Sequence, residues 1–334
     1  MTRALSVAVI QGGPSSEAEV SRASAASVAK ALAASGQRVV RLELDAYLAD
    51  SLRTGGYEVA FPVTHGAVGE DGSLQGLLEC LEVPYVGSGV LASALAMNKR
   101  AAKVMFADAG LPLAKGVALA RTIERDATRA AERALRELGE KVVVKPCSSG
   151  SAIGVTRFDG GTSAIDLARA LEAAWSLDDV VLVERFAPGR EVTCGVLDVH
   201  GDPKGARALP PTEIRAAKDA FYTYQARYAP GRSEHLCPAP FDEALTRRIQ
   251  EVAVAAHRAL GCRDLCRADF VVGERPEDVV LLEVNTLPGF TETSLYPEAA
   301  GIAGIPMPEL CRSLAAGAHA RGATPRNAAI PLPR

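Results

Sequence analysis

Two apolar runs in the last third of the chain each carry two polar residues at alternate positions. The run VVLLEVN contains Glu283 and Asn285, and the run CRADFVV contains Arg267 and Asp269. Because successive residues of a β-strand point to opposite faces, both members of each pair project from one face of a buried strand. The residues GERPED between the runs are typical of a turn, so the two runs are predicted to form a hairpin.

The register of this hairpin decides what its polar face can do. We expect Asp269 to lie opposite Glu283. The same register places Arg267 opposite Asn285 and gathers four polar groups on one face. Two carboxylates, an amide oxygen and a guanidinium suit a hard divalent metal beside an anionic oxygen. The alternative is a buried ion-pair cluster without a metal, because an ionised carboxylate in a buried strand needs a positive partner.

A small-residue loop after a strand-like run is a candidate phosphate-binding segment. The run VVVKP contains Lys145 and is followed by SSGSAIG at residues 148–154. Glycine and serine let backbone amides and hydroxyls approach phosphate oxygens closely, while the lysine supplies charge. The loop has neither the Walker order nor a dinucleotide fingerprint. A flexible hairpin with a solvated lysine is therefore the alternative interpretation.

Two further segments gain meaning only from their order along the chain. Lys99, in MNKR, is by itself a solvated helix residue. The run at 181–191, VLVERFAPGRE, is a strand that leads into exposed backbone able to bind an adenine edge. The chain thus presents a lysine, a lysine with a glycine-rich loop, a strand with its linker, and the Asp/Glu/Asn hairpin, in that order.

Composition excludes several classes of protein. The 334 residues are 48% hydrophobic and 23% charged with a net charge of -3, so neither nucleic acid nor a membrane surface is an expected partner. No run approaches 18 apolar residues and no signal-peptide pattern opens the chain, which favours the cytoplasm. Seven scattered cysteines without a Cys-x-x-Cys pair predict reduced thiols and no zinc site.

The elements that must position these residues fall into three groups. Strand and helix signals alternate up to about residue 86, which predicts an open parallel sheet with helices on both faces and ligands beyond the strand ends. Helices are expected at 92–109 and 123–138, followed by β-rich stretches and a final α/β segment from about 207 to 314. The predicted domains are 1–97, an N-terminal α/β substrate-binding domain; 98–188, a small lobe; 189–318, a lobe with the metal site; and 319–334, a tail.

This order of motifs resembles the ATP-grasp superfamily and, within it, the D-alanine:D-alanine ligases. The similarity extends over about residues 5 to 314. It implies a three-domain α/β architecture, in which a pre-ATP-grasp domain is followed by two α+β lobes that enclose the nucleotide. The motifs that carry it are GGPSSEAEVS from Gly12, HGAVGEDG from His65, PYVGSG from Pro84, FYTYQARY from Phe221 and NTLPGFT from Asn285.

The resemblance implies roles for the matched positions in binding ATP and metal. Asp269, Glu283 and Asn285 would hold two Mg²⁺ ions, with Mn²⁺ as an alternative ion. Arg267 would stabilise the transferring phosphoryl group and the tetrahedral intermediate. The nucleotide would contact Lys99 and Lys145 through its phosphates, Glu184 and Ala187 through adenine, Glu191 through ribose, and Arg227.

The resemblance also implies two D-alanine sites. Glu17 would anchor the ammonium of the first D-alanine with His65 nearby, and Ser151 and Tyr228 would bond with this glutamate. Ser294 and the Leu295 backbone would meet the carboxylate of the second D-alanine, helped by Arg227. Without the resemblance, Glu17 is a helix-start carboxylate, Tyr228 a loop aromatic and His65 a core histidine.

The expected activity is ATP-dependent ligation of two D-alanine molecules through an acyl phosphate, for peptidoglycan precursor synthesis, by a cytoplasmic homodimer. A related ligase for other small amino acids is the first alternative, and a non-catalytic binding protein is the second. The sequence departs from the family pattern at five positions, which bear on rate, loop closure and second-substrate preference. They are Ala18, Ala152, Thr223, Gln225 and Arg227. The retained Tyr228 favours an amine as the second nucleophile.

Overall fold

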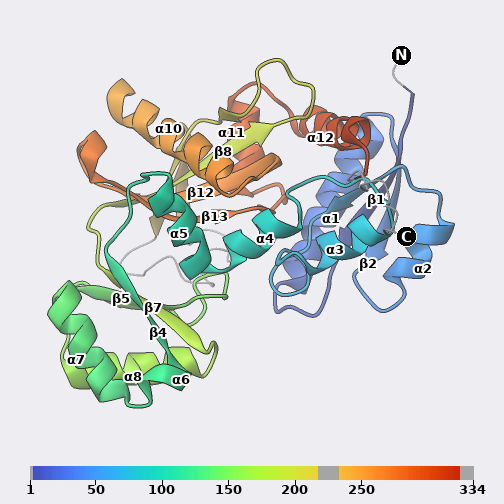
Figure 1. Cartoon of the computed structure of the whole chain (residues 1–334). Helices are drawn as coiled ribbons and strands as arrows, with labels where there is room; N and C mark the ends of the chain where they lie inside the picture. Colours follow the sequence, from blue (N-terminus) through green and yellow to red (C-terminus); the bar gives the residue numbers. More distant parts are fainter. Residues whose placement is uncertain (1–2, 217–232, 324–334) are drawn as a thin grey trace, which may run out of the picture.

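The computed structural model describes residues 3–216 and 233–323. They form three sheets with their covering helices (Figure 1). Within these ranges, no helix has both the length and the apolar content that a bilayer span requires.

The first sheet is parallel and has the strand order β2-β1-β3. Alternate residues of its central strand face two different cores: Val7 and Val9 pack against α1, whereas Ala8 and Ile10 pack against α2 and α3. Both faces are therefore covered by helices, as the alternation predicted. The elements are β1 (Ser6–Gln11), α1 (Ala18–Ala34), β2 (Arg38–Glu43), α2 (Leu48–Thr54), β3 (Val59–Pro62) and α3 (Ser73–Cys80).

The second sheet is antiparallel, in the order β4-β7-β5-β6, and its helices cover one face only. Val144 and Val183 point with the other core residues toward α7 and α8, which leaves the opposite face available for polar side chains. The elements are β4 (Gly116–Ala120), α6 (Arg121–Glu124), α7 (Ala127–Leu138), β5 (Val142–Pro146), β6 (Thr156–Phe158), α8 (Ala164–Trp175) and β7 (Val180–Arg185).

The third sheet runs β11-β10-β8-β12-β13, with β9 paired to β8. On β12, Cys266, Ala268 and Phe270 belong to the core beneath α10, so Arg267 and Asp269 at the alternate positions point away from it. The elements are β8 (Arg190–Asp198), β9 (Arg207–Ala208), β10 (Thr212–Ala216), β11 (Ser233–Leu236), α10 (Glu243–Ala259), β12 (Asp264–Val272), the 3₁₀ turn η1 (Pro276–Asp278) and β13 (Val279–Asn285).

The helix predicted at 92–109 is two helices, α4 (Val90–Met97) and α5 (Lys99–Asp108). Asn98 between them is extended, with φ -97° and ψ 102°, and its side chain accepts a hydrogen bond from the Ala101 amide at 3.0 Å. Asparagine at an N-cap stabilises a new helix start and so breaks the continuous pattern. Similarly, Asp126 caps α7 and separates it from α6 within the helix predicted at 123–138.

Helices from the N-terminal and C-terminal parts of the described chain pack against each other. Helix α12 (Met307–Arg321), which follows α11 (Leu295–Ile302), packs beside α1 over the first sheet (Figure 1). Its last residue, Arg321, pairs with the buried Asp264 carboxylate of the third sheet. Helix α12 thus extends past residue 318, the predicted end of the third domain. Ala102 and Phe106 of α5, which the predicted boundaries assign to the small lobe, pack in the core of the third sheet. The four domain boundaries given above stay predictions.

Candidate active site

The predicted register of the polar hairpin is confirmed. Asp269 pairs with Glu283 and Arg267 with Asn285 across antiparallel β12 and β13. The register shifts directly after Asp269, because Phe270 pairs with residue 281 and residue 282 is extra. A bulge of this kind re-aims neighbouring side chains and is common beside active sites.

Each carboxylate of the hairpin faces a cation. Arg267 donates to both Asp269 oxygens, from Nε and Nη2, at 2.7 Å each, and Thr193 Oγ1 donates to Asp269 Oδ1 at 2.8 Å. Glu283 Oε2 lies 3.1 Å from Lys99 Nζ. The ion-pair arrangement considered as the alternative is therefore present in this state of the protein.

The same face offers a donor set that fits a hard divalent cation. Its donors are the carboxylates of Asp269 and Glu283 and the amide oxygen of Asn285, which accepts a hydrogen bond from the Leu287 amide at 2.9 Å. All are oxygens, as Mg²⁺ prefers. The Asp269 and Glu283 side chains keep 16% and 28% of their surface exposed, so a cation can reach them. The ion pairs show that this face attracts positive charge.

A cavity of about 320 Å³ lies between the second and third sheets. Lys99, Lys145, Glu184, Ala187 and Glu191 all line it, which brings the predicted nucleotide-binding residues together. Lys99 Nζ also donates to the Ser149 carbonyl at 2.7 Å, so it contacts the glycine-rich loop.

Glu184 is almost fully buried and bridges two lysines. Its Oε2 lies 2.5 Å from Lys145 Nζ, and its Oε1 lies 2.5 Å from Lys103 Nζ. Burial alone would raise the pKa of Glu184, but Lys145 and Lys103 outweigh it and hold that pKa below its usual range. Burial lowers the pKa of Lys103, whereas Glu184 overcomes burial and raises the pKa of Lys145.

The glycine-rich loop reaches the start of α1 through Ser151, whose hydroxyl donates to Glu17 Oε1. Ser151 and Ala152 have φ of 50° and 56°, a left-handed conformation that costs of order 1 kcal/mol in residues other than glycine. Glu17 is buried at the start of α1. The backbone of Gly66 approaches the residues before this helix so closely that a Cβ at Gly66 would lie 3.0 Å from the Ser15 Cβ. The Glu17–Ser151 contact implied by the resemblance is present.

Two buried titratable groups lie near Glu17. Burial and the nearby Arg267 lower the pKa of His65, although Glu17 acts in the opposite direction. The lowered pKa keeps the imidazole ring neutral. In the described parts of the chain, His65 Nε2 has no hydrogen-bond partner. Burial raises the pKa of Glu70 to about 8, although its carboxylate accepts from the Gly66 amide at 2.8 Å. A buried ring nitrogen without a partner, close to the Glu17 carboxylate, is unusual in a folded protein and marks this position as a candidate binding site for a polar group.

A second cavity, of about 450 Å³, adjoins the first. Ser294 and Leu295 line it together with Arg267 and Asp269. The Ser294 hydroxyl accepts from the Thr291 amide at 2.9 Å, which fixes the start of α11. Both cavities share three lining residues: Glu191, Leu282 and Glu283. The bulged strand β13 therefore forms a common wall between the two cavities.

The sequence matches the models of a known protein family. A family model described as D-ala D-ala ligase C-terminus matches residues 105–316, and another described as D-ala D-ala ligase N-terminus matches residues 46–88. The chain belongs to the D-alanine–D-alanine ligase family. The D-alanine–D-alanine ligase of Methylocella silvestris is 45% identical over 92% of this chain and 95% of its own length. That of Parvibaculum lavamentivorans is 44% identical over 93% and 96%.

Solved structures place the ligase in the ATP-grasp fold. The D-alanine–D-alanine ligase of Bacillus anthracis superposes with a TM-score of 0.79 at 30% identity, covering 94% of this chain and 97% of its own. A structure of the Bacillus anthracis enzyme complexed with ATP gives a TM-score of 0.76 at 27% identity, covering 95% and 98%. The predicted fold and family are thereby confirmed.

Some predicted positions of the ligase fall outside the described residues. These are Thr223, Gln225, Arg227 and Tyr228. Two residues that were not assigned to the site from the sequence lie next to assigned ones: Lys103 pairs with Glu184, and Glu70 lies near Glu17. Glu70 stands inside the quoted HGAVGEDG motif, so a signal for it existed, whereas Lys103 sits in an ordinary amphipathic helix.

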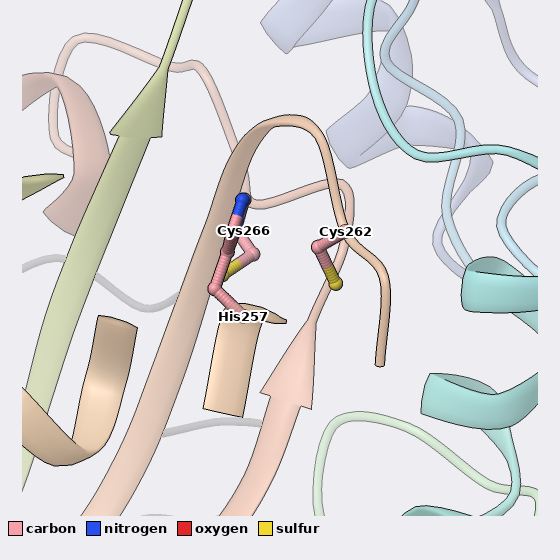
Figure 2. A group of neighbouring side chains, drawn as sticks. All are labelled: His257, Cys262 and Cys266. Carbon is pink, nitrogen blue, oxygen red and sulfur yellow. The ribbon is translucent and has the colours of Figure 1, made fainter. Parts of the chain in front are cut away.

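One further group of metal-type ligands occurs in the described part of the ligase: His257, Cys262 and Cys266 (Figure 2). His257 Nδ1 lies 3.2 Å from Cys266 Sγ, and His257 Nε2 lies 3.2 Å from Asp198 Oδ2. Burial lowers the pKa of His257 and raises that of Cys266 far above its usual value. In the structure, a neutral histidine lies in hydrogen-bond contact with a protonated thiol in this group.

Proposed function

We propose that this family member joins two D-alanine molecules at the expense of ATP. A carboxylate oxygen of the first D-alanine attacks the γ-phosphorus and releases ADP. The amine of the second D-alanine then attacks the acyl carbon and loses a proton, phosphate leaves, and D-alanyl-D-alanine forms as a peptidoglycan precursor. The observation that carries the proposal is the shared wall: Glu191 and Glu283 line both the nucleotide cavity and the cavity with Ser294.

In the proposed complex, ATP occupies the cavity of about 320 Å³. Lys99 and Lys145 neutralise its phosphates, and the adenine lies against Glu184 and Ala187, with the ribose near Glu191. Two lysines near one phosphate chain supply much of the charge stabilisation that phosphoryl transfer requires. Arg227, in the segment outside the described residues, is assigned to the same ligand.

Two Mg²⁺ ions, or Mn²⁺ in their place, are proposed on Asp269, Glu283 and Asn285, whose oxygens fit them. Such ions neutralise phosphate charge when bound. For this to occur, Asp269 and Glu283 must exchange their contacts with Arg267 and Lys99 for the metal. The two freed cations can then turn toward phosphate oxygens, and Arg267 is placed to stabilise the tetrahedral intermediate.

The two D-alanine sites are proposed on either side of Arg267. Glu17 binds the ammonium of the first D-alanine, and the neutral His65 ring lies nearby. Ser151 donates to Glu17 and holds its carboxylate in place, with Tyr228 as the second hydroxyl partner. Ser294 and the Leu295 backbone bind the carboxylate of the second D-alanine.

The test is phosphate release with ATP and Mg²⁺ across a panel of D- and L-amino acids. Turnover with D-alanine alone is the expected result, and its absence would disprove the proposed reaction. Turnover with another small amino acid in place of D-alanine would instead support the related ligase. The cytoplasmic location and the homodimer belong to the same proposal, and sedimentation of the purified protein tests the dimer.

A further inference from the structure

Lys103 is a buried lysine that the proposed function leaves without a role. It lies on α5 one helical turn after Lys99, and its side chain keeps 11% of its surface. Its ammonium forms an ion pair with Glu184 at 2.5 Å. A buried ammonium is costly to desolvate, so it is expected to be paired with a negative group.

Lys103 acts from behind the wall of the nucleotide cavity. Lys145 and Glu184 line that cavity, whereas Lys103 does not. Lys103 therefore affects a bound nucleotide chiefly through Glu184, its ion-pair partner on the cavity wall. Lys103 is in this sense a positioning residue, and it does not touch the ligand.

Two lysines, Lys103 and Lys145, pair with the single carboxylate of Glu184. In the structure described, Glu184 is shared between Lys103 and Lys145, which leaves one excess positive charge in a buried cluster. When Lys145 turns to phosphate, Glu184 loses one of its partners. A buried carboxylate left without any cation would be strongly destabilised. With Lys103 in place, the carboxylate remains paired.

We propose that Lys103 keeps Glu184 ionised and aimed into the cavity while Lys145 binds the phosphates of the nucleotide. This inference rests on the proposed nucleotide site. It identifies Lys103 as a residue that determines nucleotide affinity although it lies outside the cavity. Without Lys103, Lys145 would stay on Glu184 and be withheld from the phosphates.

The test compares Lys103→Met with Lys115→Met, the same change at an exposed lysine whose ammonium donates to the Glu137 carbonyl. Equilibrium binding of Mg·ADP is measured without D-alanine, together with KM for ATP and for D-alanine. We expect Lys103→Met to weaken ADP binding and raise KM for ATP about tenfold or more. KM for D-alanine should change less than about twofold, and Lys103→Arg should restore part of the affinity because it keeps the charge.

A double-mutant cycle separates positioning from general damage to the fold. In a Glu184→Gln background, adding Lys103→Met should change ADP affinity less than about twofold, because there is no longer a carboxylate to pair. Equal losses in both backgrounds, or a Lys103→Met protein that binds ADP like the Lys115→Met control, would overturn the inference. A wild-type protein that binds ADP but releases no phosphate with D-alanine would refute the proposed reaction alone, since this cycle needs only binding.

Discussion

Lys99 and Lys103 stand one turn apart on α5, yet they pair with carboxylates on two different sheets. Lys99 meets Glu283 on β13, and Lys103 meets Glu184 on β7. Like charges four residues apart weaken an isolated helix, so these contacts offset a local cost. Helix α5 thereby connects the second and third sheets at the cavity that lies between them.

Glu283→Ala should abolish turnover. The change removes a proposed metal ligand from the wall shared by both cavities and leaves Lys99 without its carboxylate. We expect phosphate release to fall by about a thousandfold or more, in keeping with the loss of metal-assisted charge stabilisation.

The control is Glu277→Ala, which removes an exposed carboxylate next to the same hairpin. It should retain normal turnover. Near-normal activity in Glu283→Ala would show that the metal assignment is wrong. A lower thermal midpoint with nucleotide binding intact would point instead to a structural ion pair between Glu283 and Lys99.

Ser151→Ala should impair the reaction of the first D-alanine and spare nucleotide binding. The Ser151 hydroxyl donates to Glu17, and its loss leaves this buried carboxylate with one donor fewer. Loss of a hydrogen bond to a charged group is worth about 1.5–3 kcal/mol, so kcat/KM for D-alanine should fall roughly 10- to 100-fold. Ser176→Ala, which removes an exposed hydroxyl bonded to the Ala173 carbonyl, is the matched control. An unchanged kcat/KM in Ser151→Ala would show that this hydroxyl does not contribute to the reaction of D-alanine.

The hairpin register could be predicted because its polar residues specify a face. A one-residue slip would put Arg267 and Asp269 into the apolar core beneath α10, at the positions of Cys266 and Ala268. Local pattern and burial agree here, so one register is strongly favoured.

Lys103 and the helix break at Asn98 could not be predicted in the same way. In KRAAK, Lys103 has the spacing of a solvated helix position, and its partner Glu184 lies on a strand far away in the sequence. Such a contact depends on how two sheets pack, which no local pattern encodes. Asn98 acts as a cap only because the chain turns there.

Glu70→Gln should change how stability depends on pH. Burial raises the pKa of Glu70 to about 8 in the folded protein, compared with 4.5 as the ordinary value. The unfolded chain therefore releases this proton first, and the stabilising contribution is complete below about pH 4.5 and is lost as the pH rises to about 8. Glutamine carries no such proton and still accepts from the Gly66 amide.

As the pH rises from 5.5 to 8.5, the wild type should therefore lose stability relative to Glu70→Gln, measured as the difference in their free energies of unfolding. Its slope should be at most about 1.4 kcal/mol per pH unit. Chemical denaturation at several pH values measures it, and Glu277→Gln serves as an exposed control. A difference that stays constant with pH would mean that Glu70 ionises in the folded state as it does in the unfolded chain.

Asp264→Asn should destabilise the contact between α12 and the third sheet. Asp264 is 1% exposed, accepts from the Gly87 amide at 2.8 Å and from Arg321 Nη2 at 2.9 Å, and has a φ of 64° that asparagine tolerates well. The substitution thus keeps shape and backbone but leaves the mostly buried Arg321 guanidinium without its counter-charge. Breaking one side of a buried pair costs about 3–5 kcal/mol, which denaturant titration would detect. Adding Arg321→Met should recover part of that loss, and a double variant less stable than Asp264→Asn alone would contradict the ion-pair explanation.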